Sequence, residues 1–357
     1  MAYDPFARGP YPAGVRTLHA RDDARDRVLP IEVWYPADDR YAGQDTADAT
    51  QDKYDLVPGF PPFSQDAVRD AEPRRGRHPV VAFSHGYGGH RRQSTFLCTH
   101  LASHGYVVAA VDHTGNTMTE AIQAAIRAQM HGEVPDLMAV VAHFAPLRPA
   151  DVSFMLDRVL GDFADTVDPD RVGMAGHSFG GWTTLATTAR DRRIRAALPL
   201  APAGGGGVAQ IAPLEAALRF EWDRDVPTLY VVADRDSLLP LDGMHDLFGK
   251  TRGRKRMVVL RDTDHMHFCD RAEQIHEMFR TMPMVPELQR LAPAIPAFTE
   301  LAPEAPIHRA IRGLALAHFD AALRGDERAA GFVAGDLAAA LDAEAVGALV
   351  VPPGAAT

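Results

Sequence analysis

The amino-acid sequence predicts an α/β fold with a mostly parallel central sheet, helices on both faces and lid-like insertions. Short apolar runs alternate with helix-compatible stretches, as in residues 78–84, 91–104 and 106–111. Strands that are apolar throughout are typical of a parallel sheet covered on both faces. The chain has 357 residues, 46% of them hydrophobic and 24% charged, which is sufficient for one large domain of this kind.

The expected elements follow one another in a regular order. Residues 15–20 and 28–35 have strand character and flank a polar cluster, which favours an antiparallel hairpin at a sheet edge. Residues 151–163 place Val152, Met155 and Val159 on one face and therefore predict a helix. Further strands are expected at residues 171–175, 194–200, 226–232 and 257–260, and further helices at residues 179–189 and 306–323.

Residues 1–327 are expected to form a single domain that irregular segments interrupt. These insertions span about residues 38–77, 116–144, 201–225 and 270–304. Insertions after the carboxyl ends of parallel strands are where ligand sites form. The last insertion contains Met278, Met282 and Met284, which favours a hydrophobic pocket. The Ala-rich tail, residues 328–357, is expected to be a peripheral helix with a frayed end.

The charge and composition argue against several classes of partner. Lys and Arg number 37 against 47 Asp and Glu, and the net charge of −10 disfavours nucleic acids and anionic membranes. No apolar run approaches the ~20 residues that span a bilayer, and the first residues lack the apolar core of a signal peptide. A cytoplasmic location is therefore expected. Cys98 and Cys269 are expected to be free buried thiols, with one disulfide between them as the alternative.

The segment Gly176-His177-Ser178-Phe179-Gly180 fits the Gly-x-Ser-x-Gly nucleophile elbow. It follows the predicted strand at residues 171–175 and opens the predicted helix at residues 179–189, which is the context that the elbow requires. The flanking glycines avoid a clash of Cβ atoms, and the helix amino terminus favours negative charge. The sequence therefore predicts Ser178 as a nucleophile. The alternative is that the two glycines only allow tight packing of the strand on the helix.

Candidates for an acid and a base follow later in the chain. After such an elbow, the acid and then the histidine each lie just beyond a strand. The strand at residues 226–232 leads to Asp234 and Asp236, and the last strand leads to His265 and His267. A serine hydroxyl needs a neutral imidazole as its base, and the imidazole needs a carboxylate on its other nitrogen. Both choices stay open on this reasoning, although Asp234 is the better candidate for a turn-capping role.

The loop at residues 84–89 is the expected oxyanion loop, because its glycines let the backbone curl toward a bound oxygen. One oxyanion donor is expected to be the N–H of Phe179, directly after the nucleophile, and the other the N–H of Tyr87. Four neighbouring residues are expected to contact the substrate: His85, Gly86, His177 and Trp182.

With these residues in place, the chain resembles the dienelactone-hydrolase-like branch of the α/β-hydrolase superfamily. It is similar to platelet-activating-factor acetylhydrolases and to cutinase-like polyester hydrolases from the first strand pair to the histidine loop. Residues 85–87 and 101–109 are similar to the oxyanion loop and the following helix and strand of both groups. Residues 176–181 match the elbow of the acetylhydrolases.

The resemblance also implies one choice at each open position. Residues 236–240 resemble the acid turn of the polyester hydrolases, which implies Asp236 as the acid. Residues 264–268 resemble the Asp-His-x-x-Phe segment of the acetylhydrolases, which implies His265 as the base. The acetylhydrolase acid, however, follows an earlier strand, where this chain has none. The insertions at residues 116–144 and 270–304 match neither group.

The expected activity is that of a serine-dependent carboxylic ester hydrolase, without metal or organic cofactor. Its expected substrates are small to medium esters, including short polyester fragments or truncated acyl lipids. One alternative is a metal-dependent hydrolase, which would draw on His100, His104, Asp112, His113, His265 and His267, although the Glu of a His-Glu-x-x-His motif is missing. The other is a non-catalytic binding protein on a hydrolase fold, although the chain keeps all three members of the expected triad.

Overall fold

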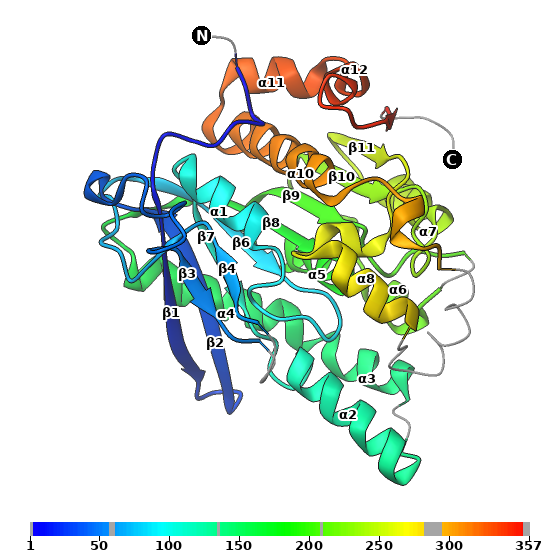
Figure 1. The fold of residues 1–357 in the computed structure, drawn as a ribbon. Helices are drawn as coiled ribbons and strands as arrows, with labels where there is room; N and C mark the ends of the chain where they lie inside the picture. Colours follow the sequence, from blue (N-terminus) through cyan, green and yellow to red (C-terminus); the bar gives the residue numbers. More distant parts are fainter. Residues whose placement is uncertain (1–2, 57–60, 134–135, 208–209, 282–294, 353–357) are drawn as a thin grey trace.

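The computed structural model describes residues 3–56, 61–133, 136–207, 210–281 and 295–352, and over these residues it has the expected α/β architecture (Figure 1). The long strands are β1 (Ala13–Asp22), β2 (Arg27–Pro36), β6 (His78–Ser84), β7 (Val107–Val111), β8 (Val167–His177), β9 (Ile194–Leu200), β10 (Thr228–Ala233) and β11 (Lys255–Leu260). The short strands are β3 (Asp52–Tyr54), β4 (Phe63–Gln65), β5 (Val68–Arg69) and β12 (Ala348–Val351).

The helices connect and cover these strands. Those of at least eight residues are α1 (Thr95–Ser103), α2 (Met118–His131), α3 (Leu137–Phe144), α4 (Leu147–Asp162), α5 (Phe179–Arg190), α7 (Leu241–Lys250), α8 (Ala272–Thr281), α10 (Glu304–Phe319) and α11 (Glu327–Ala334). Two shorter helices are α6 (Ala212–Ala217) and α12 (Leu337–Asp342).

Within the described residues, ten strands form one sheet in the order β12-β11-β10-β9-β8-β6-β7-β2-β1-β5. The six strands from β7 to β11 in this order pair in parallel. The expected hairpin of β1 and β2 is antiparallel and joins the sheet through an antiparallel pairing of β2 with β7. The prediction of a mostly parallel sheet is therefore confirmed.

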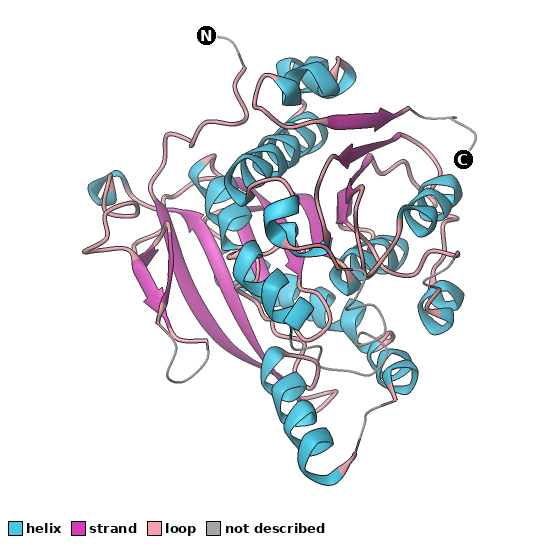
Figure 2. Ribbon diagram, turned by 45° about the vertical axis from the view of Figure 1, so that its right-hand side comes forward, coloured by secondary structure: helices cyan, strands magenta, loops and turns pink. Residues whose placement is uncertain are grey.

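Successive residues of the central strands pack into different hydrophobic clusters, as the pleat of a strand requires. Val80 and Ala82 of β6 belong to a cluster that includes Met155 of α4. Val81 and Phe83 belong to a second cluster, to which α1 and α10 contribute. Helices therefore cover both faces of the sheet (Figure 2), which explains why its strands are apolar throughout.

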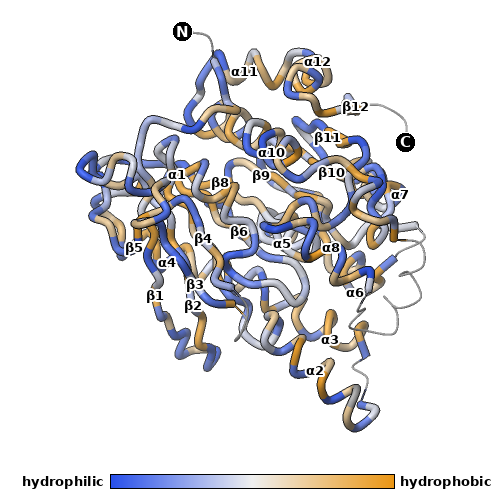
Figure 3. Tube along the Cα trace, in the orientation of Figure 1, coloured by the Kyte–Doolittle hydropathy of each residue, from blue (hydrophilic) through white to orange (hydrophobic). Residues whose placement is uncertain are grey.

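The inserted segments surround the sheet, and three of them contribute side chains such as Ala67, Phe144 and Leu214 to the larger hydrophobic cluster. Residues 38–77 contain the β3–β4 pair and β5, residues 116–144 form α2 and α3, and residues 201–225 contain α6. Hydrophobic and hydrophilic stretches alternate along α2 and α3 (Figure 3), and Ile122, Ile126 and Met130 are exposed at helical spacing on α2. The segment at residues 270–304 contains α8, whereas Met282 and Met284 lie outside the described residues.

The carboxyl-terminal tail differs from the peripheral helix with a frayed end that the sequence suggests. It forms α11 and α12, and β12 then pairs antiparallel with β11 at the edge of the sheet. Leu337, Leu341 and Val346 are buried in the larger hydrophobic cluster. The high Ala content hides this role, because only a few larger apolar side chains anchor the segment.

Two smaller expectations concern the cysteines and the membrane. Cys98 and Cys269 are both buried free thiols. Among the helices in the described part of the chain, none combines the length and the apolar composition that crossing a bilayer requires.

The parallel strands determine where the candidate site lies. Their carboxyl ends share one edge of the sheet, so the loops that follow β6, β8, β10 and β11 meet there. The expected oxyanion loop follows β6, and Ser178 follows β8. The two candidate aspartates follow β10, and the two candidate histidines follow β11. Residues that lie far apart in the sequence are therefore brought to one place.

Candidate active site

Ser178 lies on a sharp turn between β8 and α5. Its backbone has φ 60° and ψ −119°, a conformation that L-residues rarely adopt. A Cβ at Gly176 would lie 2.3 Å from the Gly180 carbonyl oxygen, and a Cβ at Gly180 would lie 1.8 Å from the Ser84 carbonyl oxygen. Glycine is therefore required on both sides of Ser178, as the elbow motif predicts. Ser178 itself is partly exposed.

Asp236 and His265 form a buried hydrogen-bonded pair. The Nδ1 atom of His265 lies 2.7 Å from the Oδ2 atom of Asp236. The other carboxylate oxygen of Asp236 accepts hydrogen bonds from the backbone N–H groups of Leu238 and Leu239, at 3.0 and 2.7 Å. These contacts orient the Asp236 carboxylate toward Nδ1 of His265. The Nε2 atom of His265 is then available to accept a proton.

Two opposing effects act on the pKa of His265. Burial disfavours the charged imidazolium and lowers the pKa. The attraction of the Asp236 carboxylate, together with the hydrogen bond between them, is stronger in sum, so the pKa is raised above its ordinary value of 6.5. Asp264 adds to this effect by its charge.

The loops carrying Ser178 and His265 lie against each other. The ring of His177, the residue before Ser178, lies 4.4 Å from the ring of His265 between centroids and also stacks on Phe268. Within the described residues, no hydrogen bond joins the Ser178 hydroxyl to His265. In unliganded sites such bonds are often long and tighten only when substrate binds.

The other two candidates for acid and base have structural partners. The side chain of Asp234 accepts a hydrogen bond from the Thr263 N–H at 3.2 Å and thereby joins the ends of β10 and β11. In His267, Nδ1 accepts from the Asp264 N–H at 3.0 Å and Nε2 donates to the Ala302 carbonyl at 2.9 Å. Both ring nitrogens of His267 are therefore occupied.

Gln93 is a residue at the site that the sequence did not reveal. Its Oε1 accepts a hydrogen bond from the Gly86 N–H at 2.9 Å, and its Nε2 donates to Nδ1 of His177 at 3.1 Å. The Gln93 side chain thus joins the expected oxyanion loop to the turn that carries Ser178. The N–H of Phe179 is the first of α5 and has no acceptor within the helix, as an oxyanion donor requires.

Two of the residues expected to contact the substrate are fully buried. His85 is fully buried, donates from Nδ1 to the Gly86 carbonyl and accepts at Nε2 from the His113 N–H. Trp182 is also fully buried and donates to the Leu214 carbonyl at 2.9 Å. Both side chains hydrogen bond to backbone groups of the protein, and their contact with a substrate stays a prediction.

The remaining two expected contacts lie next to the elbow. His177 is 2% exposed and packs against the His265 ring. A Cβ at Gly86 would lie 3.4 Å from the Cβ of Ser178, so the expected oxyanion loop passes directly beside the expected nucleophile. A contact of these two residues with substrate stays a prediction.

The histidines considered as metal ligands have other partners. The Nε2 atoms of His100 and His104 lie 3.0 and 2.9 Å from the carbonyl oxygens of Pro5 and Ala7. His113 lies between Ser84 and Asp151, 2.9 and 3.0 Å from their side-chain oxygens. In the part of the chain that the structure describes, no group of three or more His, Cys, Asp or Glu is arranged to hold a metal ion.

Comparisons with known proteins agree with this architecture. The family described as platelet-activating factor acetylhydrolase, isoform II, matches residues 15–143, and the prolyl oligopeptidase family matches residues 92–204. The platelet-activating factor acetylhydrolase of Canis lupus familiaris is 24% identical over 54% of this chain and 48% of its own. The cutinase of Thermobifida fusca (strain YX) is 30% identical over 45% of this chain and 43% of its own. The chain thus matches less than half the length of each of these relatives.

A solved structure extends the similarity to most of the chain. The ferulic acid esterase from Streptomyces cinnamoneus is 27% identical and superposes with a TM-score of 0.62, covering 89% of this chain and 92% of that one. Since the two proteins share their fold over nearly their whole lengths, the present chain is an α/β hydrolase, and it resembles platelet-activating factor acetylhydrolases and cutinases.

Proposed function

We propose that this protein is a serine-dependent carboxylic ester hydrolase that works through an acyl-enzyme intermediate. The observation that carries the proposal is the buried Asp236–His265 pair, 2.7 Å apart, against the loop that presents Ser178 on a nucleophile elbow. A serine, a carboxylate and an imidazole, in this order along the chain, are the components of acyl transfer to water. The comparisons support the same reaction class, because the relatives are named as acetylhydrolase, cutinase and esterase.

In the proposed mechanism, the Ser178 hydroxyl attacks the ester carbonyl and Nε2 of His265 takes its proton. Asp236 keeps the other nitrogen of His265 protonated and stabilises the imidazolium. The N–H groups of Phe179 and Tyr87 bind the oxyanion of the tetrahedral intermediate. His265 then gives its proton to the leaving alcohol, and water repeats the sequence on the acyl-enzyme.

We propose small to medium esters as substrates. The names of the relatives point to short acyl groups on lipids, to polyesters and to feruloyl esters. A cavity of about 540 Å³ beside α6 is lined by Arg219, Glu215 and Lys250 among others, and neither Ser178 nor His265 contributes to it. We therefore do not assign this charged cavity to the acyl group.

The test combines covalent labelling with a substrate panel. A fluorophosphonate probe should label wild-type protein on Ser178, identified by peptide mass spectrometry. A panel of p-nitrophenyl esters with graded acyl lengths, extended by a platelet-activating-factor analogue, a polyester oligomer and methyl ferulate, should then rank the substrates. Activity that a chelator abolishes, or a protein that neither reacts with the probe nor hydrolyses any ester, would contradict the proposal.

The pH dependence of the reaction should report on His265. A general base must be neutral, and a raised pKa means that His265 is protonated at higher pH than an ordinary histidine. We therefore expect kcat/KM to fall as the pH decreases, with a midpoint above about 6.5. A pH–rate profile between about pH 5 and pH 9 checks this. A flat profile with chemistry rate-limiting would count against a histidine base.

Replacing Asp236 by Asn should lower kcat by about 10⁴, because the amide favours the wrong tautomer of His265. It also removes the negative charge that raises the pKa of His265 and leaves burial, which lowers it. The acid limb of the remaining activity should therefore move to lower pH. Asp234→Asn is the matched control, because an amide oxygen can still accept the hydrogen bond from Thr263. A larger loss in the control would assign the acid to Asp234.

A further inference from the structure

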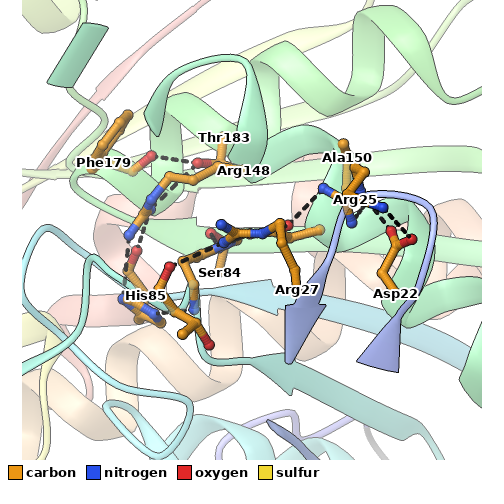
Figure 4. Close-up of polar contacts among 12 residues, drawn as sticks. Asp22, Arg25, Arg27, Ser84, His85, Arg148, Ala150, Phe179 and Thr183 are labelled. Carbon is orange, nitrogen blue, oxygen red and sulfur yellow. Dashed lines mark hydrogen bonds and ion pairs between the residues drawn. The ribbon is translucent and has the colours of Figure 1, made fainter. Parts of the chain in front are cut away.

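A guanidinium group is buried directly behind the oxyanion loop. Arg148, in the first turn of α4, is fully buried. Its Nη1 donates to the His85 carbonyl at 2.7 Å and its Nη2 to the Gly86 carbonyl at 3.0 Å. Its Cζ lies 4.2 Å from the centre of the Phe179 ring, and Figure 4 shows the side chain extending between Phe179 and His85. One cation therefore contacts both segments that supply the proposed oxyanion donors.

The contact with Gly86 also determines the direction of the Tyr87 N–H, because the Gly86 carbonyl and the Tyr87 N–H belong to one peptide unit. That unit is planar and trans, so its C=O and N–H point in opposite directions. Arg148 and Nδ1 of His85 hold the carbonyl from behind, at 3.0 and 2.7 Å. The positive charge also polarises the peptide and makes its N–H a stronger donor.

The second donor is held from the same side. The Phe179 carbonyl accepts a hydrogen bond from the Thr183 hydroxyl at 2.8 Å, and this hydroxyl lies 3.5 Å from Nη1 of Arg148. The guanidinium over the Phe179 ring adds a cation–π interaction, which is stronger in a buried environment. Arg148 is thus in contact with the side chain of one donor residue and with the peptide of the other.

Burial of the Arg148 guanidinium carries a desolvation cost in the free energy of folding. Burial lowers the pKa of Arg148 to about 9, so the group stays charged at neutral pH but is disfavoured in its surroundings. Within the described residues, Arg148 forms no ion pair with a carboxylate: Asp151 offsets burial only by its charge at longer range, and the Nε of Arg148 has no hydrogen-bond partner. The nearby Asp151 pairs instead with Arg25 and Arg27. A hydrocarbon side chain would avoid this desolvation cost.

The helix that carries Arg148 is itself anchored to the strand ends. Asp151, one turn later on α4, hydrogen bonds to His113, and His113 hydrogen bonds to Ser84 at the end of β6. Arg27 binds the Asp151 carboxylate from the β1–β2 hairpin. This buried chain fixes the first turn of α4 relative to the oxyanion loop that follows Ser84.

We propose that Arg148 is a positioning residue for ester hydrolysis, which aligns the Tyr87 and Phe179 N–H groups on the same oxyanion from behind the loop. The inference rests on the proposed function. In this role Arg148 does not contact the substrate. Its loss should therefore raise the free energy of the transition state, where the oxyanion forms, more than that of the bound substrate.

Arg148→Met and Arg148→Lys test this role. For Arg148→Met we expect kcat to fall by about 10², similar to the loss of one oxyanion donor, with KM changed by less than about threefold. The inhibition constant of a trifluoromethyl ketone, which forms a tetrahedral adduct, should rise by the same factor as kcat/KM falls. Arg148→Lys should lower kcat roughly tenfold, because an ammonium cannot span both carbonyls. If Arg148→Met does not fold, Arg148→Lys provides the test.

The matched control is Arg224→Met. The Nη2 atom of this partly buried arginine donates to the carbonyls of Thr188, Asp191 and Ile194, at the carboxyl end of α5 and the start of β9. Arg224→Met should lower the melting temperature while leaving kcat/KM and the inhibition constant of the ketone unchanged. Arg148 variants that lose stability in the same way but keep both kinetic values within about threefold would overturn the proposal. Wild-type protein that neither hydrolyses esters nor reacts with a fluorophosphonate would instead contradict the function on which it rests.

Discussion

Replacing Ser178 by Ala should lower kcat for ester hydrolysis by about 10⁵–10⁶ while the protein keeps its fold. In the proposed mechanism the Oγ atom of Ser178 forms the covalent bond of the acyl-enzyme, and alanine has no nucleophilic atom to replace it. The fold should survive because alanine meets the same backbone demand as serine at φ 60°. Initial rates on p-nitrophenyl esters, labelling by fluorophosphonate and the melting temperature are the measurements.

A second serine provides the control for this experiment. Ser153 lies on α4. Its hydroxyl donates at 2.8 Å to Asp191, which lies between the end of α5 and the start of β9. Ser153→Ala should keep the labelling and most of the activity. If folded Ser178→Ala protein retained most of the wild-type rate, the serine mechanism would be wrong, whatever the structure of the elbow.

Replacing His265 by Ala should have an effect of similar size, a loss of about 10⁶ in kcat. The imidazole is needed twice, first to take the proton of Ser178 and then to protonate the leaving alcohol. The residual activity should also lose the acid limb of the pH profile, because the titrating group has been removed. A pH–rate profile of the variant measures both effects, and circular dichroism checks its folding.

His267→Ala is the control two residues away. This ring binds the Asp264 N–H and the Ala302 carbonyl, so its removal should lower the melting temperature and disturb the loop. Its kcat should fall far less than that of His265→Ala. The reverse order, an inactive His267→Ala protein and an active His265→Ala protein, would place the base at His267.

The sequence was sufficient to predict features that depend on local patterns. The elbow is an example, because Gly176 and Gly180 are required by contacts within a few residues and at one neighbouring strand end. Apolar runs predicted the parallel strands, since side chains on both faces of a covered sheet must be buried. The chain order of serine, acid and histidine limited the candidates to two residues at each of two positions. Resemblance to known families then indicated Asp236 and His265, which the structure joins by a hydrogen bond.

The tertiary structure decided what depends on contacts between distant segments. His85 and Trp182 lie beside the motifs in the sequence, and only the structure shows that both are buried and hydrogen bonded to the backbone of His113 and Leu214. Arg148 has no motif around it, and its partner His85 lies 63 residues away in the sequence. The edge strand β12 escaped notice for a related reason, because its pairing partner β11 lies far back in the chain. Residue type and spacing determine local conformation, whereas the partner of a buried polar group is determined only when the loops meet in the folded protein.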